Sequence, residues 1–173
     1  LSYTGLGRAV AAGAEVFERV TRYYPKPSFG LEHTTVDGEY VRVTETVAKR
    51  HPFCDLVHFR RDPAAVAHRA DPTVLVVAPL SGHYATLLRG TVEALLPDHD
   101  VYITDWENAR EVGASHGGFG LHDYIGLIME FVHVLGPDTH IIGVCQPSVP
   151  VLAAVSLMAQ ADDPDQPASM TLM

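Results

Sequence analysis

The sequence has few basic residues and no long apolar run. Lys and Arg together number 12, against 21 Asp and Glu, which leaves a formal net charge of −9. A surface that acidic repels phosphate backbones and anionic lipid, which argues against nucleic-acid binding and polybasic membrane attachment. The longest nearly apolar stretch, residues 149–159, has about half the length that a membrane-spanning helix needs. No secretory signal opens the chain.

Cysteine is also scarce. The chain contains two, Cys54 and Cys145, which are too few for a disulfide framework. Such usage is typical of a reducing compartment, where a thiol is packed or reactive rather than bridged, so we expect a cytoplasmic location. The sequence has no Gly-rich phosphate loop. Its Gly5-x-Gly7 lacks a preceding strand and a third glycine, so we expect no dinucleotide cofactor.

The ten histidines follow no common metal-ligand spacing. His116 and the pair His122-Asp123 flank a Gly-rich stretch, and the pair is typical of a helix start. His133 and His140 fall on an expected helix face and at an expected strand entry, where structural histidines are common. The sequence therefore predicts no metal site.

What the sequence does have is enough apolar residues, 47% of 173, for one compact core. Residues 1–25 are expected to form an amphipathic helix that ends at Pro25, packed on the domain or, as the alternative, docked to a partner. Residues 26–173 are expected to form the domain. The chain starts without Met and stops inside an apolar strand, so we expect it to be a piece of a longer protein.

The order of the remaining patterns predicts an α/β fold. Alternating residues around the turn signal Asp37-Gly38 indicate antiparallel strands over 31–36, 39–47 and 54–60. From residue 73 on, apolar runs alternate with helical patterns, which is typical of a parallel sheet. We expect strands over 73–78, 100–104, 139–144 and 169–173, and helices over 84–96, 121–135 and 145–160.

The strongest chemical signal is the run Gly143-Val144-Cys145-Gln146-Pro147, where an expected buried strand turns into a helix. It resembles the nucleophile elbow of the α/β-hydrolases, usually Gly-x-Ser-x-Gly. The position two before the nucleophile must be small, and Gly143 is. The helix N-terminus favours the thiolate of Cys145. Cys54 has no such context, and we assign it to packing.

Two loops are expected beside this elbow. Pro79-Leu80-Ser81-Gly82-His83 follows the first buried strand and is placed to offer one oxyanion-hole amide, near Ser81 or Gly82, with the amide of Gln146 as the other. The second loop, which contains Asp105, Trp106 and Arg110, follows the next strand. Asp105 and Arg110 are candidates for a bracing pair, and Trp106 for the wall of an apolar cleft.

Four segments in order resemble the intracellular polyhydroxyalkanoate depolymerase family: 78–83, 85–89, 105–110 and 143–147, continued by 149–156. The resemblance implies an α/β-hydrolase-like, mostly parallel sheet with antiparallel N-terminal strands. It implies hydrolysis of stored poly(3-hydroxybutyrate) at a granule surface, with Cys145 as nucleophile. His83 is expected to be a structural or substrate-contacting loop residue rather than the general base. In such a fold the triad acid and histidine follow strands seven and eight, and the expected strand over 169–173 corresponds to strand six of that fold. Both later strands and both residues are therefore expected beyond Met173.

Two alternatives remain open. A polyester synthase-like acyltransferase would also use a cysteine and an Asp-Trp loop, although its elbow usually has glycine at the place of Pro147. A non-catalytic granule-surface protein could keep the fold without the chemistry. The sequence leaves the polymer's side-chain length, the acyl acceptor and the oligomeric state undetermined.

Overall fold

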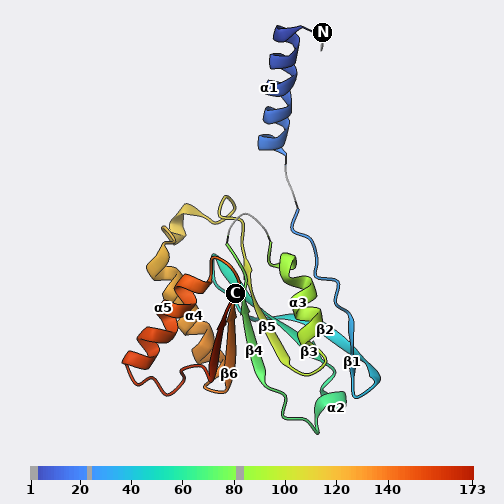
Figure 1. Ribbon diagram of the computed structural model, residues 1–173, viewed down its shortest axis with the longest axis vertical. Helices are drawn as coiled ribbons and strands as arrows, with labels where there is room; N and C mark the ends of the chain where they lie inside the picture. Colours follow the sequence, from blue (N-terminus) through green and yellow to red (C-terminus); the bar gives the residue numbers. More distant parts are fainter. Residues whose placement is uncertain (1–3, 23–24, 81–83) are drawn as a thin grey trace.

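A seven-stranded sheet organises the domain, with the order β1-β2-β3-β5-β4-β6-β7 (Figure 1). The computed structural model describes residues 4–22, 25–80 and 84–173. The strands are β1 (His33–Val36), β2 (Glu39–Lys49), β3 (Cys54–Arg61), β4 (Thr73–Val77), β5 (Asp100–Trp106), β6 (Thr139–Gly143) and β7 (Ser169–Leu172). The pairs β1–β2, β2–β3 and β3–β5 are antiparallel, and β5–β4, β4–β6 and β6–β7 are parallel. The predicted α/β fold, with antiparallel strands at its start and parallel strands after them, is confirmed.

Helices pack on both faces of this sheet. On one side lie α4 (Leu121–Leu135) and α5 (Ser148–Gln160), which contact each other, and on the other lies α3 (Arg89–Leu95) (Figure 1). Short helical turns complete the connections: α2 (Pro63–Val66), η1 (Ala85–Leu88) and η2 (Ala114–His116). The core is centred on β3, β4 and β5, where Leu56, Leu75 and Ile103 are fully buried. Such layering explains the continuous apolar run of β4, since both of its faces are covered.

The helix α1 (Gly5–Thr21) differs from expectation in its packing. The amphipathic pattern correctly predicts a helix, capped by the Thr4 hydroxyl, which accepts from the Gly7 amide at 3.1 Å. None of its residues is buried, and in Figure 1 it projects from the domain. Its apolar side chains are exposed, Phe17 by 70%. The expected packing of this helix on the domain is therefore wrong, because helical periodicity specifies an apolar stripe but not its partner.

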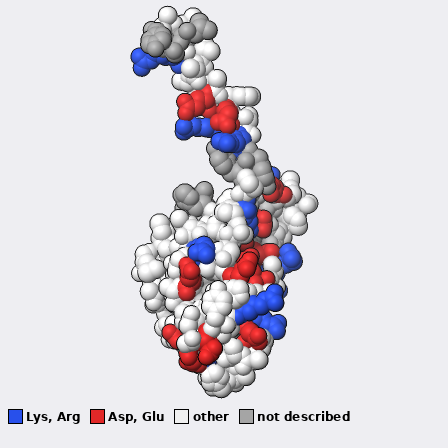
Figure 2. Space-filling view, turned by 90° about the vertical axis from the view of Figure 1, so that its right-hand side faces the viewer, with Lys and Arg blue, Asp and Glu red and all other residues white. Residues whose placement is uncertain are grey.

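The surface charge is dispersed. Figure 2 shows Lys and Arg interleaved with Asp and Glu over the face that it displays. Many of these charges form ion pairs, such as Lys49 with Glu130 at 3.1 Å and Arg69 with Asp71 at 2.8 Å. Within residues 4–22, 25–80 and 84–173, no helix combines the length and hydrophobicity that crossing a membrane requires.

Candidate active site

Cys145 occupies a strained turn between β6 and α5. Its φ of +66° lies in the left-handed region, which residues with a side chain rarely adopt, and its side chain is exposed. The backbone is held by two hydrogen bonds: the Cys145 amide donates to the Met173 carbonyl at 2.6 Å, and the Ser148 amide donates to the Cys145 carbonyl at 3.0 Å. A strained residue between a buried strand and a helix is the geometry of a nucleophile elbow.

Helix α5 begins at Ser148, three residues later than expected. Pro147 is its N-cap residue, and the first helical hydrogen bond runs from the Val151 amide to the Pro147 carbonyl at 2.9 Å. Pro150 falls in the first turn, where a missing N–H leaves no intrahelical bond unmade.

Gly143 is required by close packing. A Cβ built at this position would lie 3.3 Å from Leu172 Cδ2, 3.3 Å from Val151 Cγ2 and 3.4 Å from the Pro147 carbonyl oxygen. Strand β7 and helix α5 both crowd against this point, so the expectation that the position must be small is confirmed.

The side chain of Gln146 links the elbow to the loop after β4. Its Oε1 accepts a hydrogen bond from the Leu80 amide at 3.1 Å. The Gln146 backbone amide donates to no other residue in the described part of the chain. Three further candidates of this loop, Ser81, Gly82 and His83, lie outside the described residues. The Gln146–Leu80 bond was not indicated by the sequence, because it joins residues 66 positions apart.

Asp105 pairs with a different residue from the one expected. Its Oδ2 lies 2.7 Å from Lys26 Nζ, whereas Arg110 is exposed and its backbone amide donates to Asn108 Oδ1 at 3.1 Å. The predicted Asp105–Arg110 brace is therefore wrong. Lys26 precedes the first strand, and no local pattern joins it to β5.

Burial raises the pKa of the Asp105 carboxyl, although the hydrogen bond and charge of Lys26 oppose the rise. Its Oδ1 is buried without a hydrogen-bond partner among the described residues. Burial by itself would lower the pKa of Lys26, but its contact with Asp105 outweighs this effect and raises it. The pair thus holds a positive and a negative charge together near the carboxyl end of β5.

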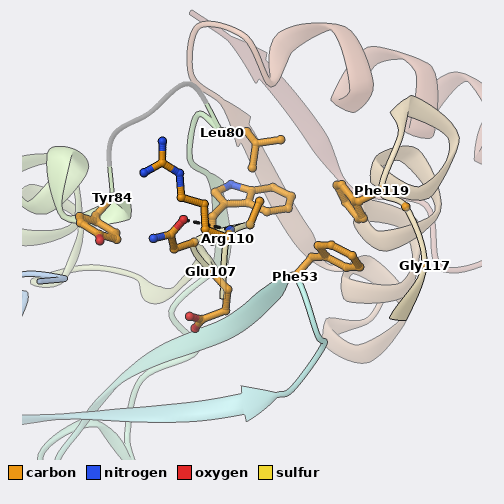
Figure 3. A pocket seen from close by; sticks show the side chains of 11 residues that line it. Phe53, Leu80, Tyr84, Glu107, Arg110, Gly117 and Phe119 are labelled. Atoms are coloured by element: carbon orange, nitrogen blue, oxygen red, sulfur yellow. Dashed lines mark hydrogen bonds between the residues drawn. The ribbon is translucent and has the colours of Figure 1, made fainter. Parts of the chain in front are cut away.

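An aromatic pocket of 710 Å³ opens beside the same sheet edge (Figure 3). Its wall includes Phe53, Leu80, Tyr84, Trp106 and Phe119, with Glu107, Asn108 and Arg110 as polar lining. The Phe53 and Phe119 rings stack at 4.9 Å between centroids, and the Trp106 Nε1 donates to the Ala78 carbonyl at 2.8 Å. The expectation that Trp106 walls an apolar cleft is confirmed.

Cys145 does not line this pocket, but Leu80 connects the two. Leu80 lies in the pocket wall and donates to Gln146, the residue directly after Cys145. Sequence reasoning missed Phe53 and Phe119 as wall residues. Phe53 belongs to the site because its carbonyl accepts from the Glu107 amide at 2.9 Å, a consequence of β3 and β5 pairing in antiparallel fashion.

Some of the histidine positions singled out in the sequence have structural roles. At the start of α4, Asp123 Oδ2 accepts from the Gly120 amide at 2.7 Å, which confirms the expected helix start at His122-Asp123. His140 Nδ1 lies 2.7 Å from Ser169 Oγ on the neighbouring strand.

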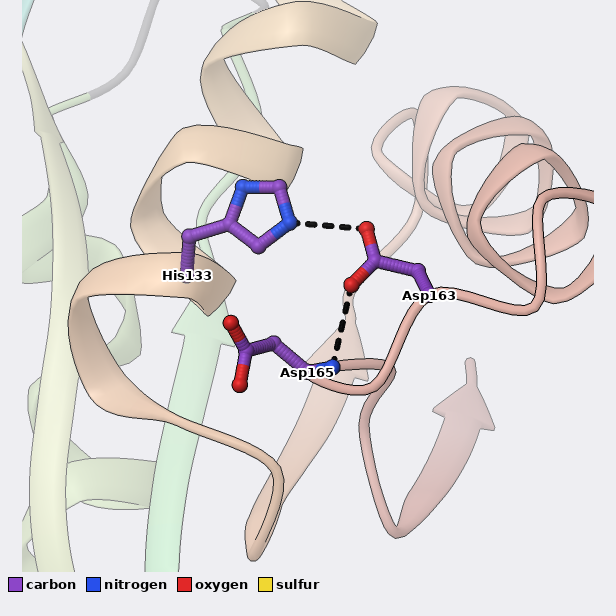
Figure 4. A group of neighbouring side chains, drawn as sticks. All are labelled: His133, Asp163 and Asp165. Carbon is purple, nitrogen blue, oxygen red and sulfur yellow. Dashed lines mark hydrogen bonds and ion pairs between the residues drawn. The ribbon is translucent and has the colours of Figure 1, made fainter.

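His133, Asp163 and Asp165 form a cluster that the spacing did not indicate, with ligand-type atoms within 4.8 Å of one another (Figure 4). His133 Nε2 lies 2.8 Å from Asp163 Oδ2, and Asp163 Oδ1 accepts from the Asp165 amide at 3.0 Å. These bonds join α4 to the loop after α5, and the hydrogen bond from His133 lowers the pKa of Asp163.

Comparisons with known proteins find distant structural similarity only. No protein-family model and no curated protein matches the chain. Similar solved structures include brefeldin A esterase, a bacterial homologue of human hormone-sensitive lipase (15% identity, TM-score 0.46, 94% of this chain and 46% of that one). Another is the Francisella virulence factor BioJ (14% identity, TM-score 0.46, 96% of this chain and 50% of that one). A third is the esterase Est22 (15% identity, TM-score 0.46, 99% of this chain and 52% of that one). The chain spans about half the length of these proteins.

Proposed function

We propose that this chain carries the nucleophile of an ester hydrolase, and that the nucleophile is Cys145. The observation that carries the proposal is an exposed thiol at a φ of +66°, between the end of β6 and the start of α5. A structural cysteine gains nothing from that backbone conformation, whereas a nucleophile is held clear of its neighbours by it.

The chemistry follows from the position of the thiol. The Cys145 thiolate attacks the ester carbonyl carbon, a C–S bond forms, and the C–O bond to the alcohol breaks after the tetrahedral intermediate collapses. A general base that takes the proton of the Cys145 thiol returns it to the alkoxide, which leaves as the alcohol, and water then cleaves the thioester to release the acid and restore the thiol. The Gln146 amide is the donor proposed to stabilise the oxyanion, together with an amide of the loop at Ser81 or Gly82.

The Gln146 side chain has a supporting role in this scheme. Because its Oε1 accepts from the Leu80 amide, it joins Leu80, at the start of the loop after β4, to the elbow. Preorganised donors stabilise developing charge without reorganising during the reaction. Gln146 is thus proposed to position the oxyanion hole through its side chain and to contribute to it through its backbone.

The proposed substrate is poly(3-hydroxybutyrate) or a related polyhydroxyalkanoate, bound by a cytoplasmic protein at a storage-granule surface. The resemblance of segments 78–83, 105–110 and 143–147 to the depolymerase family supports this assignment. The aromatic pocket supports it independently, since a largely apolar cavity whose wall residue Leu80 bonds to Gln146, the neighbour of Cys145, accommodates the aliphatic body of a hydroxyalkanoate unit. Asp105 is proposed to support the loop through Lys26, while Trp106 and Arg110 contact the substrate.

An activated ester tests the nucleophile without requiring a proton donor for the leaving group. The chain is mixed with p-nitrophenyl butyrate, and nitrophenolate release and the mass of each cysteine peptide are followed together. We expect one equivalent of nitrophenolate and a butyryl group on Cys145. Hydrolysis of the thioester, and of 3-hydroxybutyrate oligomers, is then measured separately to distinguish a hydrolase from an acyltransferase that needs a hydroxy-acid acceptor.

Matched cysteine variants make this test decisive. The Cys145→Ala variant should release no stoichiometric nitrophenolate, and the Cys54→Ala variant should match the wild type. Acylation of Cys54 in the folded chain, or an undiminished reaction in Cys145→Ala, would show that the nucleophile is assigned wrongly. A folded wild-type chain that is not acylated would favour the non-catalytic alternative.

A further inference from the structure

Most basic side chains of this acidic chain have a carboxylate partner, but four arginines do not. Eight of the 12 Lys and Arg residues lie within 4.0 Å of an Asp or Glu oxygen. In the described residues, no such pair is made by Arg8, Arg42, Arg60 or Arg110. With 21 acidic residues available, unpaired arginines are the exception on this surface.

Two of the four meet in one hollow on the sheet. Arg42, Thr44 and Thr46 alternate along β2 and therefore share one face, and Arg60 lies directly opposite Thr44 on β3. Together they line a hollow of 400 Å³. Arg42 and Arg60 are thus diagonal neighbours across two paired strands, a spacing that long side chains span.

The other polar groups of the hollow are the Thr46 hydroxyl, the Asp62 carboxylate and the Arg61 guanidinium. Thr46 Oγ1 donates to the His58 carbonyl at 3.4 Å. Asp62, the carboxylate in the lining, accepts from the Ala64 amide at 3.0 Å through its Oδ1, and no ion pair joins it to Arg42 among the described residues. Arg61 on β3 lies opposite Val43 on β2, and its guanidinium Nη1 is 2.8 Å from Asp71 Oδ2.

We propose that Arg42, Arg60 and the Thr44 hydroxyl form a binding site for the phosphate group of a small phosphorylated molecule. In the part of the chain that the structure describes, neither guanidinium is in an ion pair with the Asp62 carboxylate of the hollow, and an anion bound between two neighbouring guanidinium groups removes their mutual repulsion. Guanidinium groups match phosphate oxygens in geometry and charge. The site lies on β2 and β3, away from Cys145, and is independent of the proposed esterase activity.

A phosphate fits the donor set better than a carboxylate. A carboxylate has two oxygens, which the fork of one arginine satisfies, whereas a phosphate monoester presents three terminal oxygens. Those three oxygens can accept from Arg42, from Arg60 and from the Thr44 hydroxyl at once. The volume of 400 Å³ leaves room for the organic part of a phosphate ester.

Calorimetric titration of the chain with inorganic phosphate and with glycerol phosphate tests the site, with acetate as the carboxylate probe. Saturable binding of both phosphates is expected, with acetate weaker by at least about tenfold. Arg42→Ala and Arg60→Ala should each weaken phosphate binding by at least about tenfold, and Thr44→Val by less. Arg8→Ala, which removes the same charge from α1, should leave the affinity unchanged.

Several outcomes would overturn the proposal. They are an absence of saturable phosphate binding by the wild type, equal affinity for acetate, and equal loss in Arg8→Ala and Arg42→Ala. Binding to phosphatidic acid vesicles without binding of free phosphate would assign the hollow to a membrane surface instead. Thermal unfolding of each variant without ligand provides the folding control, and exposed Arg42 and Arg60 should be replaceable without loss of stability.

Discussion

The two cysteines lie at the same end of the sheet, where the parallel strands finish, but one is buried and the other is exposed. Cys145 follows β6, and Cys54 begins β3, which runs against β5 so that Cys54 lies opposite Trp106 at the end of that strand. Cys54 is fully buried, and burial followed by the nearby Asp105 charge raises the pKa of its thiol well above the usual value. Cys145 is exposed at a positive φ.

The difference shows that location at the carboxyl edge of the parallel strands does not by itself make a cysteine reactive. Cys54 is part of a regular ladder, and its Sγ donates to the Asp55 carbonyl at 3.6 Å inside the core. Cys145 stands where the ladder has ended and the helix has not begun. The local backbone conformation, rather than the thiol itself, therefore distinguishes the proposed nucleophile Cys145 from the packed Cys54.

Alkylation should separate the two thiols most strongly. With iodoacetamide near neutral pH, the native chain should be modified at Cys145 at least about a thousandfold faster than at Cys54, because Cys54 reacts only when the core opens. Peptide mapping over time measures both rates. In concentrated urea the two rates should converge, and a native Cys54 rate close to that of Cys145 would contradict the comparison.

Two glycine substitutions test how tightly the elbow is packed. Gly143→Ala should lower the free energy of unfolding by about 1–3 kcal/mol, because the new Cβ meets Leu172, Val151 and Pro147 at 3.3–3.4 Å. Gly126→Ala, in α4 with nothing within 4 Å of the new Cβ, should raise it by about 0.4–1 kcal/mol. Urea unfolding measures both changes. Butyryl transfer to Cys145 should slow only in Gly143→Ala, and equal effects at both sites would refute the packing argument.

The ion pair between Lys26 and Asp105, close to Cys54, can be broken by replacing Lys26. Lys26→Met removes the positive partner of Asp105 and should lower the free energy of unfolding at pH 7 by about 1–3 kcal/mol. The pKa of Asp105 is already raised in the folded chain. Its ionisation therefore lowers the free energy of unfolding as pH rises above the pKa of about 3.9 that an Asp has in the unfolded chain. Without Lys26 that pKa should rise further.

The stability gap between Lys26→Met and wild type should therefore widen from pH 4 to pH 7, and urea unfolding at the two pH values measures it. Lys49→Met, which removes an exposed partner of Glu130, should change stability by less than about 0.5 kcal/mol at either pH. A gap that narrows toward pH 7 would mean that Asp105 is not the group affected.

Much of the fold could be predicted locally. The helix α4 was expected over residues 121–135 and has those bounds, because its apolar positions repeat at helical spacing between a Gly-rich start and Gly136-Pro137. The strand β4 was expected from a continuous apolar run, and the small residue at Gly143 from the turn that must follow β6. These features depend on neighbours a few positions apart, which the sequence displays directly.

Long-range partners could not be predicted in the same way. Asp105 was expected to pair with Arg110 within its own loop, but β5 carries it to Lys26, 79 positions earlier. The aromatic pocket has a similar origin, since Phe53 and Phe119 meet only after β3 pairs with β5. Helix α1 shows the same limit, because its apolar stripe was visible and its lack of a packing partner was not.

The sequence by itself determined the order of strands and helices, the apolar core positions and the strand–cysteine–helix junction at Cys145. Each of these is set by hydrophobic periodicity and by nearby Gly and Pro residues. The tertiary structure decided which charges pair, how Gln146 joins the loop after β4 to the elbow, and where Arg42 and Arg60 meet. Those arrangements depend on strand order and register, which bring together residues that no local spacing relates.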